Sequence, residues 1–505
     1  MKIAFKADAS REMGTGHVMR CLALASALKK LGAEISFVSR EFDGNANDLI
    51  RECGFTVLPL PSLRPENWKA DADQTIAALS KAQLRPDWLV ADHYALARPW
   101  EERLRSVAKR ILVIDDLANR PHDADMLVDQ NFRAESSSDE RYAGLLASQC
   151  RQLLGLKYAL LREEFVVAAA SAQARTCEVA RIAVCFGGTD PTNETTRALE
   201  ALESLGLPGV SIDVIAGKSN ANVEALQQLR AKSPRTLLHV QTKRMAELLA
   251  SADLAIGAGG VGLWERACVG VPSVTLAIAD NQVPGAQAFA EAGHHLYLGK
   301  AADVTAEALA GAIEALLGDK QRLRHFSSST LKLVDGRGAE RVARLMCPLA
   351  ITLRKAEPAD RDRIFEWRND PAVRRNIHDT SEISRQAHDQ WFTAALSNPA
   401  RELLIGEAED GPVGVLRFDV TDTNALVSIY LVPSRIGAGL GAALLEAGTA
   451  WVRANRPEVA TINAEVLPEN KASAAAFTAA GYSKRETGFV KKLKPASSSG
   501  FSGRR

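Results

Sequence analysis

Cysteine is scarce in this chain and follows no pattern, with seven in 505 residues and no pair at C-x-x-C spacing. Scattered thiols of this kind are typical of reduced cytoplasmic proteins, so we expect neither disulfides nor a metal site. Long apolar runs are missing too, since none reaches the roughly 18 residues of a membrane-spanning helix. The N-terminal Met-Lys-Ile-Ala-Phe is too short for a signal peptide. These absences predict a cytoplasmic protein without membrane insertion.

An excess of charge of either sign is also lacking. The 62 lysines and arginines against 61 aspartates and glutamates leave a formal net charge of +1. This balance argues against bulk electrostatic binding to nucleic acid. The apolar share of 46% and charged share of 24% are ordinary for globular protein, and 505 residues exceed what one core organises. We therefore expect several domains, and we find no internal repeat.

Residues 1–345 alternate short apolar runs with helical stretches, which predicts α/β architecture. Many runs are continuous in Val, Ile and Leu, as in parallel strands buried on both faces. The expected strands are 2–8, 88–92, 110–116, 126–131, 181–190, 211–217, 237–242, 254–260 and 272–278. The Ala-rich stretch 168–174 reads as a connection, so we predict two Rossmann-like domains, residues 1–165 and 175–345, facing each other across a cleft.

A different pattern begins near residue 352. We expect an α+β domain over 352–494, followed by a disordered tail at 495–505. Its expected elements are a first strand near 353, helices at 360–374 and 385–397, strands at 401–408, 412–419 and 425–432, a last strand at 461–467 and a helix at 471–480.

The tightest motif is Gly14-Thr15-Gly16-His17, between the first strand and a helix over 18–30. Two glycines let the backbone approach a ligand closely, and the free N–H groups of a helix start favour an anion. A histidine there faces whatever the phosphates carry, and imidazole titrates near neutrality, which suits a general base. The alternative interpretation is that His17 only caps the helix or contacts phosphate.

A second glycine-rich loop, residues 257–262, follows the strand at 254 and opens a helix. Its Gly260, Val261 and Gly262 fit a second phosphate cradle. Glu265, one turn into the helix, is placed to accept hydrogen bonds from ribose hydroxyls. The alternative is that these glycines only permit tight strand–helix packing. Two such loops in corresponding places of two α/β halves favour a nucleotide ligand in the cleft.

Eight segments together resemble one family specifically. They are Ala7–Ser10, Gly14–Leu22, Asp92–Tyr94, Ile114–Asp116, Asp129–Asn131, Gly155–Arg162, Phe186–Asp190 and Gly260–Arg266. Residues 1–345 are thereby similar to the UDP-2,4-diacetamido-2,4,6-trideoxy-β-L-altropyranose hydrolases of pseudaminic acid biosynthesis, which have the two-domain GT-B fold. The resemblance implies attack of water at the anomeric carbon, release of UDP and no metal.

The resemblance also suggests residue roles. It makes His17 the base that activates water. Asp8, at the end of the first strand, would orient His17 or bind sugar, and Asp92 and Tyr94 would contact the acetamido sugar. For the pair Asp115–Asp116, acids in the cleft and a strand-end turn stay equally open.

A third glycine-rich turn lies in the last domain, between the strand ending at Leu431-Val432 and the helix that follows. Its N–H groups suit a pyrophosphate. This segment resembles the acetyl-CoA signature of GNAT acetyltransferases. Residues 353–356 and 366–369 match the members that acetylate amino-sugar nucleotides and also some protein N-acetyltransferases. The resemblance implies acetyl-CoA as co-substrate and the contacts Leu431, Val432, Gly437, Gly439, Leu440, Gly441, Ala442 and Asn470.

The GNAT resemblance has two departures. Ile436 stands where the family usually has Arg or Gln, with Arg435 one residue away, but backbone donors can still bind the pyrophosphate. Phe477 stands at the place of the usual tyrosine acid. Proton transfer would then use Tyr482 or water as acid, and Glu465 is the candidate base. A GNAT fold that binds ligand without transferring acetyl is the alternative.

The two resemblances together imply consecutive reactions on a UDP-amino-sugar. Acetyl-CoA would acetylate the 4-amino group of UDP-4-amino-4,6-dideoxy-N-acetyl-β-L-altrosamine, and water would then release UDP. One alternative is a GT-B glycosyltransferase, or a hydrolase of another nonulosonate pathway, with the GNAT domain acetylating a different amine. Another is a non-catalytic nucleotide-sugar sensor with a protein-acetylating module.

Overall fold

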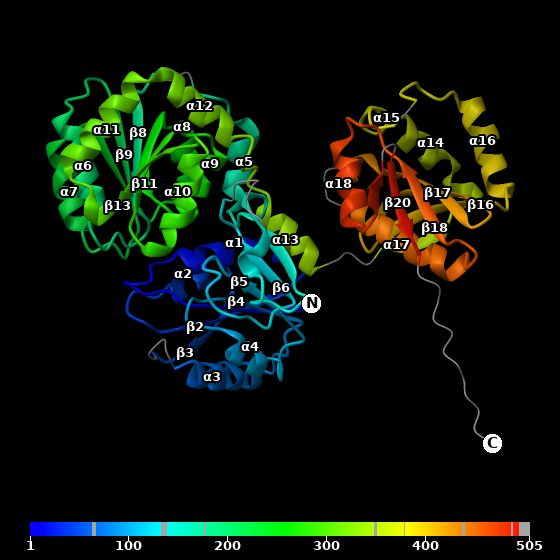
Figure 1. Cartoon of the computed structure of the whole chain (residues 1–505), viewed down its shortest axis with the longest axis horizontal. Helices are drawn as coiled ribbons and strands as arrows, with labels where there is room; N and C mark the ends of the chain where they lie inside the picture. The colour runs from blue at the N-terminus through cyan, green and yellow to red at the C-terminus, as the bar shows by residue number, and fades with distance from the viewer. Residues whose placement is uncertain are drawn as a thin grey trace. The chain divides into compact units, whose positions relative to one another are not determined.

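A computed structural model describes residues 1–62, 67–132, 139–175, 178–347, 351–377, 379–436, 440–485 and 488–493. The chain divides into two compact units, Met1–Cys347 and Pro348–Arg505 (Figure 1). The expected tail at 495–505 lies outside the described residues.

The first half of unit one is a parallel sheet of seven strands in the order β3-β2-β1-β4-β5-β6-β7. The strands are β1 (Lys2–Ala7), β2 (Glu34–Arg40), β3 (Thr56–Leu60), β4 (Trp88–Asp92), β5 (Arg110–Ile114), β6 (Met126–Asp129) and β7 (Arg151–Leu154). The helices are α1 (Gly16–Lys30), α2 (Asn47–Glu52), α3 (Trp68–Lys81) and α4 (Arg98–Leu104), and the next helix, α5 (Glu163–Ser171), packs on the second half. Helices α1 and α2 pack on one face and α3 and α4 on the other, so the central strands are buried on both faces.

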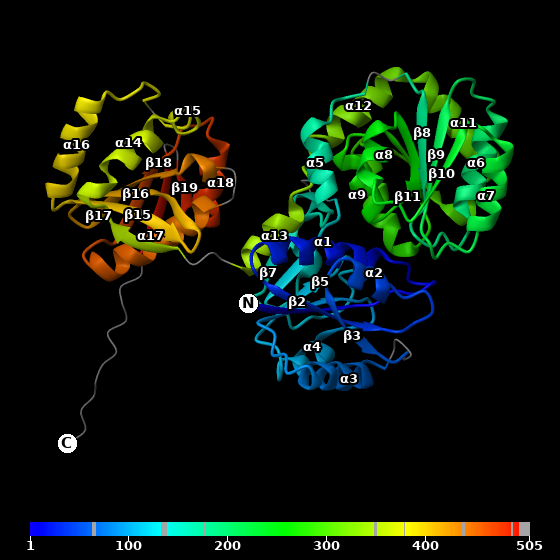
Figure 2. The same ribbon diagram turned by 180° about the vertical axis from the view of Figure 1, so that it is seen from behind.

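The second half repeats this architecture with six parallel strands in the order β10-β9-β8-β11-β12-β13. The strands are β8 (Arg181–Cys185), β9 (Ser211–Ala216), β10 (Thr236–Val240), β11 (Leu254–Ala258), β12 (Ser273–Ala277) and β13 (Leu296–Lys300). The helices are α6 (Glu194–Ser204), α7 (Val223–Lys232), α8 (Met245–Ser251), α9 (Val261–Cys268), α10 (Val283–Glu291), α11 (Ala306–Gly318) and α12 (Lys320–Thr330). Figure 2 shows helices on both sides of this sheet, and two apolar clusters fill its two faces.

The last helix of unit one, α13 (Gly338–Met346), packs on the first sheet rather than the second. Its Val342 and Met346 belong to the same cluster as the apolar face of α1, and the Trp88 indole donates to the Met346 carbonyl at 3.0 Å. From the sequence we had placed these residues in the second domain. Two doubly wound domains with a returning C-terminal helix have the architecture of the GT-B fold, which confirms the predicted fold class for residues 1–347.

Unit two is a mixed sheet of seven strands in the order β14-β15-β16-β17-β18-β20-β19. The strands are β14 (Thr352–Lys355), β15 (Arg401–Ala408), β16 (Gly411–Thr421), β17 (Asn424–Leu431), β18 (Thr461–Glu465), β19 (Ser483–Arg485) and β20 (Gly488–Lys492). The helices are α14 (Arg361–Asn369), α15 (Pro371–Arg374), α16 (Arg385–Ser397), α17 (Leu440–Asn455) and α18 (Lys471–Ala479). Helices α17 and α18 cover one face and α14 and α16 the other, which is the predicted α+β domain.

Candidate active sites

Polar side chains meet where three neighbouring strands of the first sheet end. Strands β1, β4 and β5 are adjacent, so the chain segments that follow them share the carboxyl edge of the sheet. His17 lies in the first turn of α1, Asp92 ends β4, and Asp116 follows β5 by two residues. Arg20 lies one turn beyond His17 on the same helix. Sequence order therefore separates these groups, while sheet order brings them together.

The His17 imidazole is held on one ring nitrogen. Its Nδ1 lies 2.6 Å from Asp92 Oδ1, and its ring meets the ring of Tyr94 edge to face at 4.6 Å between centroids. The residue is 8% exposed, so it is largely buried and still reachable. An ionised carboxylate only accepts hydrogen bonds, and Nδ1 must therefore carry the proton. The unprotonated Nε2 then has a free lone pair for a ligand or water.

Asp92 is fully buried and held by charge. The Arg20 guanidinium donates to both carboxylate oxygens, from Nε at 2.6 Å and from Nη2 at 2.7 Å. Burial by itself raises the pKa of Asp92, but Arg20 and His17 outweigh it and hold the pKa far below its ordinary value. The residue that holds His17 is thus Asp92, which the sequence had suggested as a sugar contact.

Asp8, the orienting residue considered from the sequence, makes other contacts. Its carboxylate pairs with Lys6, accepts from the Arg40 backbone N–H at 2.8 Å, and lies 3.7 Å from His93 Nε2. Burial and the nearby Lys6 lower the pKa of His93 to about 4, so this imidazole is neutral. Asp8 therefore belongs to a buried ion cluster beside the His17 site.

The pair Asp115–Asp116 divides between the two roles left open. Asp115 is fully buried, accepts from the Tyr142 hydroxyl at 3.1 Å and pairs with Arg120 at 2.8 Å, so it fixes the turn. Asp116 accepts from Arg20 Nη1 at 3.0 Å, so it faces the site.

Tyr94 links the His17 site to the second half of unit one. Its hydroxyl accepts from Asn281 Nδ2 at 2.7 Å. Burial, followed by the two carboxylates Asp116 and Asp92, raises the pKa of Tyr94 well above its ordinary value, so the phenol stays protonated. Neither Arg20 nor Asn281 was named as a site residue from the sequence. The spacing of Arg20 from His17, three residues along a helix, was the available signal for it, whereas Asn281 carried none.

The first glycine loop faces a loop of the second sheet. Gly14 has a φ of +72°, which favours glycine, and the loop leads through Thr15 and Gly16 into α1. After β8, a Cβ added to Gly188 would lie 2.9 Å from Thr15 Oγ1. A side chain at position 188 would therefore collide with Thr15, and the glycine allows the two loops to lie in close contact.

The second glycine loop joins β11 to α9. Gly260 has a φ of +76°, and a Cβ on Gly257 would lie 2.2 Å from the Cys185 carbonyl oxygen. Val261 and Gly262 begin α9, so the N–H groups of the helix start are at the loop. Glu265 is 12% exposed at its side chain and accepts from Arg162 Nη2 at 3.0 Å, which fixes its carboxylate.

In unit two, strands β17 and β18 pair only at their start. Asn424–Leu426 pairs with Thr461–Asn463, after which β17 continues along β16 and β18 along β20. The strands therefore diverge toward Leu431 and Glu465, and the Val432 N–H donates to the Val413 carbonyl on β16 at 2.9 Å. Leu440 begins α17, and Gly441 allows close packing, since its Cβ would lie 3.2 Å from Ala476 Cβ. Ala442 follows in the first turn, while Gly437 and Gly439 lie outside the described residues.

The remaining predicted residues of unit two take three different positions. Glu465 is exposed at the end of β18. Asn470 caps α18 through its Oδ1, which accepts from the Ser473 N–H at 2.9 Å, and its Nδ2 donates to the Asn376 carbonyl. The Tyr482 hydroxyl is buried and lies 3.1 Å from Thr449 Oγ1, and burial raises its pKa. The structure thus places Tyr482 in the core and Glu465 at the opening.

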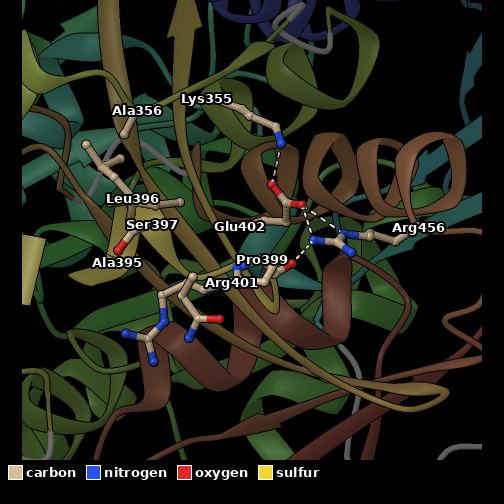
Figure 3. A pocket seen from close by; sticks show the side chains of 11 residues that line it. Lys355, Ala356, Ala395, Leu396, Ser397, Pro399, Arg401, Glu402 and Arg456 are labelled. Carbon is tan, nitrogen blue, oxygen red and sulfur yellow. Dashed lines mark hydrogen bonds and ion pairs between the residues drawn. The ribbon is translucent and has the colours of Figure 1, made fainter. Parts of the chain in front are cut away.

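A cavity of about 390 Å³ lies at the other end of the same sheet. Figure 3 shows Glu402 between Lys355 and Arg456, at 3.0 Å from Lys355 Nζ and 2.8 Å from Arg456 Nε. Glu402 lies at the start of β15. Further along β15, Gly406 pairs with Gly414 of β16, and Gly414 pairs with Leu431 at the end of β17. The cavity is therefore separate from the opening between β17 and β18.

Two features are absent from the described ranges. Within them, no helix is both long enough and apolar enough to cross a membrane. In the same part of the chain, no three His, Cys, Asp or Glu side chains gather as ligands for a metal ion.

Comparison with known proteins divides the chain in the same way. Residues 350–483 match the acetyltransferase (GNAT) domain family. The UDP-2,4-diacetamido-2,4,6-trideoxy-β-L-altropyranose hydrolase of Campylobacter jejuni is 27% identical over 257 residues, which are 51% of this chain and 84% of that protein. The spore coat polysaccharide biosynthesis protein SpsG of Bacillus subtilis is 24% identical, over 68% of this chain and 98% of its own length.

A third relative is the uncharacterized protein MJ1062 of Methanocaldococcus jannaschii. It is 28% identical over 287 residues, 55% of this chain and 55% of the archaeal protein. The chain thus matches only about half of that relative's length.

Proposed function

Because the chain joins a segment homologous to a UDP-sugar hydrolase to a GNAT acetyltransferase domain, we propose that it is a bifunctional enzyme of pseudaminic acid biosynthesis. Unit two acetylates the 4-amino group of UDP-4-amino-4,6-dideoxy-N-acetyl-β-L-altrosamine, with acetyl-CoA as donor. Unit one then hydrolyses the product, UDP-2,4-diacetamido-2,4,6-trideoxy-β-L-altropyranose, to UDP and free sugar. The two domains catalyse consecutive steps, which gives a reason for their fusion.

The hydrolytic step rests on the geometry of His17. Asp92 holds Nδ1, and Nε2 is left as a base beside the loop of Gly14, Thr15 and Gly16. Nε2 takes a proton from water as the water oxygen bonds to the anomeric carbon, and the bond from that carbon to the diphosphate oxygen breaks. Tyr94 packs edge to face against the His17 ring, and its neutral hydroxyl is held by Asn281.

The second glycine loop serves the leaving group. The helix start at Gly260, Val261 and Gly262 offers N–H donors to the diphosphate, and these donors stabilise the negative charge that develops as UDP leaves. Glu265, oriented by Arg162, accepts hydrogen bonds from the ribose hydroxyls.

For the acetyl-transfer step, the opening between β17 and β18 takes the pantetheine arm. The N-terminus of α17 takes the pyrophosphate. Glu465 accepts a proton from the amine, directly or through water, as the nitrogen bonds to the thioester carbonyl. The thiolate leaves as CoA and takes up a proton from water. Tyr482 has no part in this step, because its hydroxyl is in the core.

The test is to incubate the chain with the UDP-4-amino sugar, with and without acetyl-CoA, and to follow products by mass spectrometry. We expect one acetyl group to be gained first and UDP to appear afterwards. His17→Gln should stop at the acetylated nucleotide sugar, while His325→Gln, at an exposed histidine, should behave as the unmodified chain does. Stereoisomeric UDP-amino sugars run in parallel define the sugar. No acetylation, or UDP release only when a sugar acceptor is added, would overturn the proposal.

A further inference from the structure

We infer that Arg20 is a positioning residue for the hydrolytic step: its guanidinium locks Asp92 so that His17 keeps one tautomer and stays an unprotonated base. The inference rests on the proposed role of His17. Arg20 is 3% exposed and its guanidinium is engaged by Asp92 and Asp116, so it acts through these neighbours.

The Arg20 guanidinium holds Asp92 at a fixed geometry. Arg20 binds Asp92 through Nε and Nη2, one to each carboxylate oxygen, and Asp116 through Nη1. A planar guanidinium with three donors engaged cannot rotate without breaking all of them. The carboxylate plane of Asp92 is therefore fixed, and so is the direction in which its Oδ1 accepts from His17.

The ionised Asp92 fixes the tautomer of His17. Arg20 keeps Asp92 ionised, so both carboxylate oxygens are acceptors. At 2.6 Å from Oδ1, an unprotonated Nδ1 would set lone pair against lone pair. The proton therefore stays on Nδ1, and the lone pair stays on Nε2. Were Asp92 neutral, it could donate to Nδ1 and move the histidine proton to Nε2, which removes the base.

Arg20 also balances the negative charge around the His17 imidazole. The facing ionisable groups are Asp92 from β4, Tyr94 and His93 from the segment after it, Asp116 from the segment after β5, and Arg20 from α1. Tyr94 and His93 are neutral, which leaves two carboxylates. Arg20 is the cation that faces them, and its Nη2 lies 3.3 Å from His17 Nδ1. Without it, two anions would favour the imidazolium, which cannot act as a base.

The test compares Arg20→Lys, Arg20→Met and a matched control, Arg105→Met. Arg105 makes a similar fork on Asp123 in the same domain, far along the chain from the His17 motif. The pH dependence of kcat/KM for UDP release is measured for the full chain. We expect kcat to fall at least about tenfold in both Arg20 variants, with KM changing little. In Arg20→Met the acid limb should move to higher pH by about one unit. The control should keep the profile of the unmodified chain.

A second readout does not depend on activity. In ¹⁵N-histidine NMR of the full chain, with His17 assigned by His17→Gln, the unmodified protein should show the Nδ1–H tautomer. Arg20→Lys keeps the buried positive charge and so protects folding, but a lysine cannot bind both carboxylate oxygens at fixed geometry. The Asp92 carboxylate can then turn away from Nδ1, and we expect a mixture of tautomers. A purely structural Arg20 predicts an unchanged tautomer and pH profile in a folded Arg20→Lys, and that result overturns the inference. If the unmodified chain releases no UDP, the proposed function fails, and the tautomer still decides the role of Arg20.

Discussion

At Asp92, one buried carboxylate couples catalysis to folding. Because its pKa in the folded chain is lowered by Arg20 and His17, its ionisation stabilises the fold at neutral pH. That contribution begins to be lost as the pH falls below about 4, the ordinary value for aspartate, and decreases further toward the lower folded pKa.

The corresponding prediction concerns Asp92→Asn. At pH 7 we expect this change to lower the free energy of unfolding by about 3–5 kcal/mol, because a buried ion pair loses one partner. The difference from the unmodified chain should shrink between pH 4 and pH 3, measured by urea unfolding at stepped pH. Asp73→Asn removes an exposed partner of Arg103 and should cost under about 1 kcal/mol throughout. A difference for Asp92→Asn that is constant with pH would contradict the electrostatic account.

In unit two, substitutions of Glu465 and Tyr482 distinguish an effect on catalysis from an effect on packing. Glu465→Gln removes the proposed base at the strand opening, so kcat for acetyl transfer should fall by about 100-fold, with the loss smaller at high pH where more amine is already unprotonated. Tyr482→Phe removes only a buried hydroxyl bonded to Thr449, so kcat should stay within about twofold while stability falls by about 1 kcal/mol. Thiol release from acetyl-CoA measures both. A large loss of kcat in Tyr482→Phe would contradict this assignment and would indicate that Tyr482 is the acid that protonates the thiolate.

Local motifs made His17 and Glu265 predictable, because each follows a glycine loop at a helix start. Asp92 was named from the sequence, but its partnership with His17 was not. That pairing depends on β4 lying next to β1 in the sheet, which no local pattern contains. Asn281 was missed for the same reason, since it reaches Tyr94 from the other half of the unit.

At the scale of elements, the strands that the sequence missed in the two parallel sheets lack a continuous apolar run. Strands β3, β7 and β13 lie at sheet edges, and their side chains are mostly half-buried or exposed, so they lack a continuous apolar run. Strand β2 is interior, but polar residues interrupt its apolar run, including the buried Ser39 and Arg40. The other interior strands of the two parallel sheets were predicted, with ends that differ by a few residues, whereas β19 and β20 of unit two were also missed.

The glycine loop before α9 gives a prediction about an element. Gly257→Ala would bring a Cβ to 2.2 Å from the Cys185 carbonyl oxygen, on a neighbouring strand that cannot move cheaply. We expect the free energy of unfolding to fall by about 1–3 kcal/mol and UDP affinity to fall as the loop shifts. Gly311→Ala, on the exposed face of α11 with no atom within 4 Å of the new Cβ, should be neutral or stabilise by about 0.5–1 kcal/mol. Melting curves with titrated UDP measure both. An unaltered UDP affinity in Gly257→Ala would show that this loop does not bind the nucleotide.

At the scale of the whole molecule, each unit has its own apolar cores. Among the described residues, four apolar clusters belong to residues 1–347 and two to unit two. Units with separate cores can unfold in separate transitions, and a ligand that binds one folded unit stabilises that unit alone.

Scanning calorimetry of the full chain should therefore show two transitions that respond to different ligands. At about 100 times its dissociation constant, a ligand adds about 2.7 kcal/mol to the unit that binds it. UDP should raise only the transition of residues 1–347, and CoA only that of the second unit. Gly257→Ala identifies the first transition, because it lowers the stability of one unit without touching the other. A single transition that both ligands raise together would contradict the independence of the two units and would instead require an interface that couples their folding.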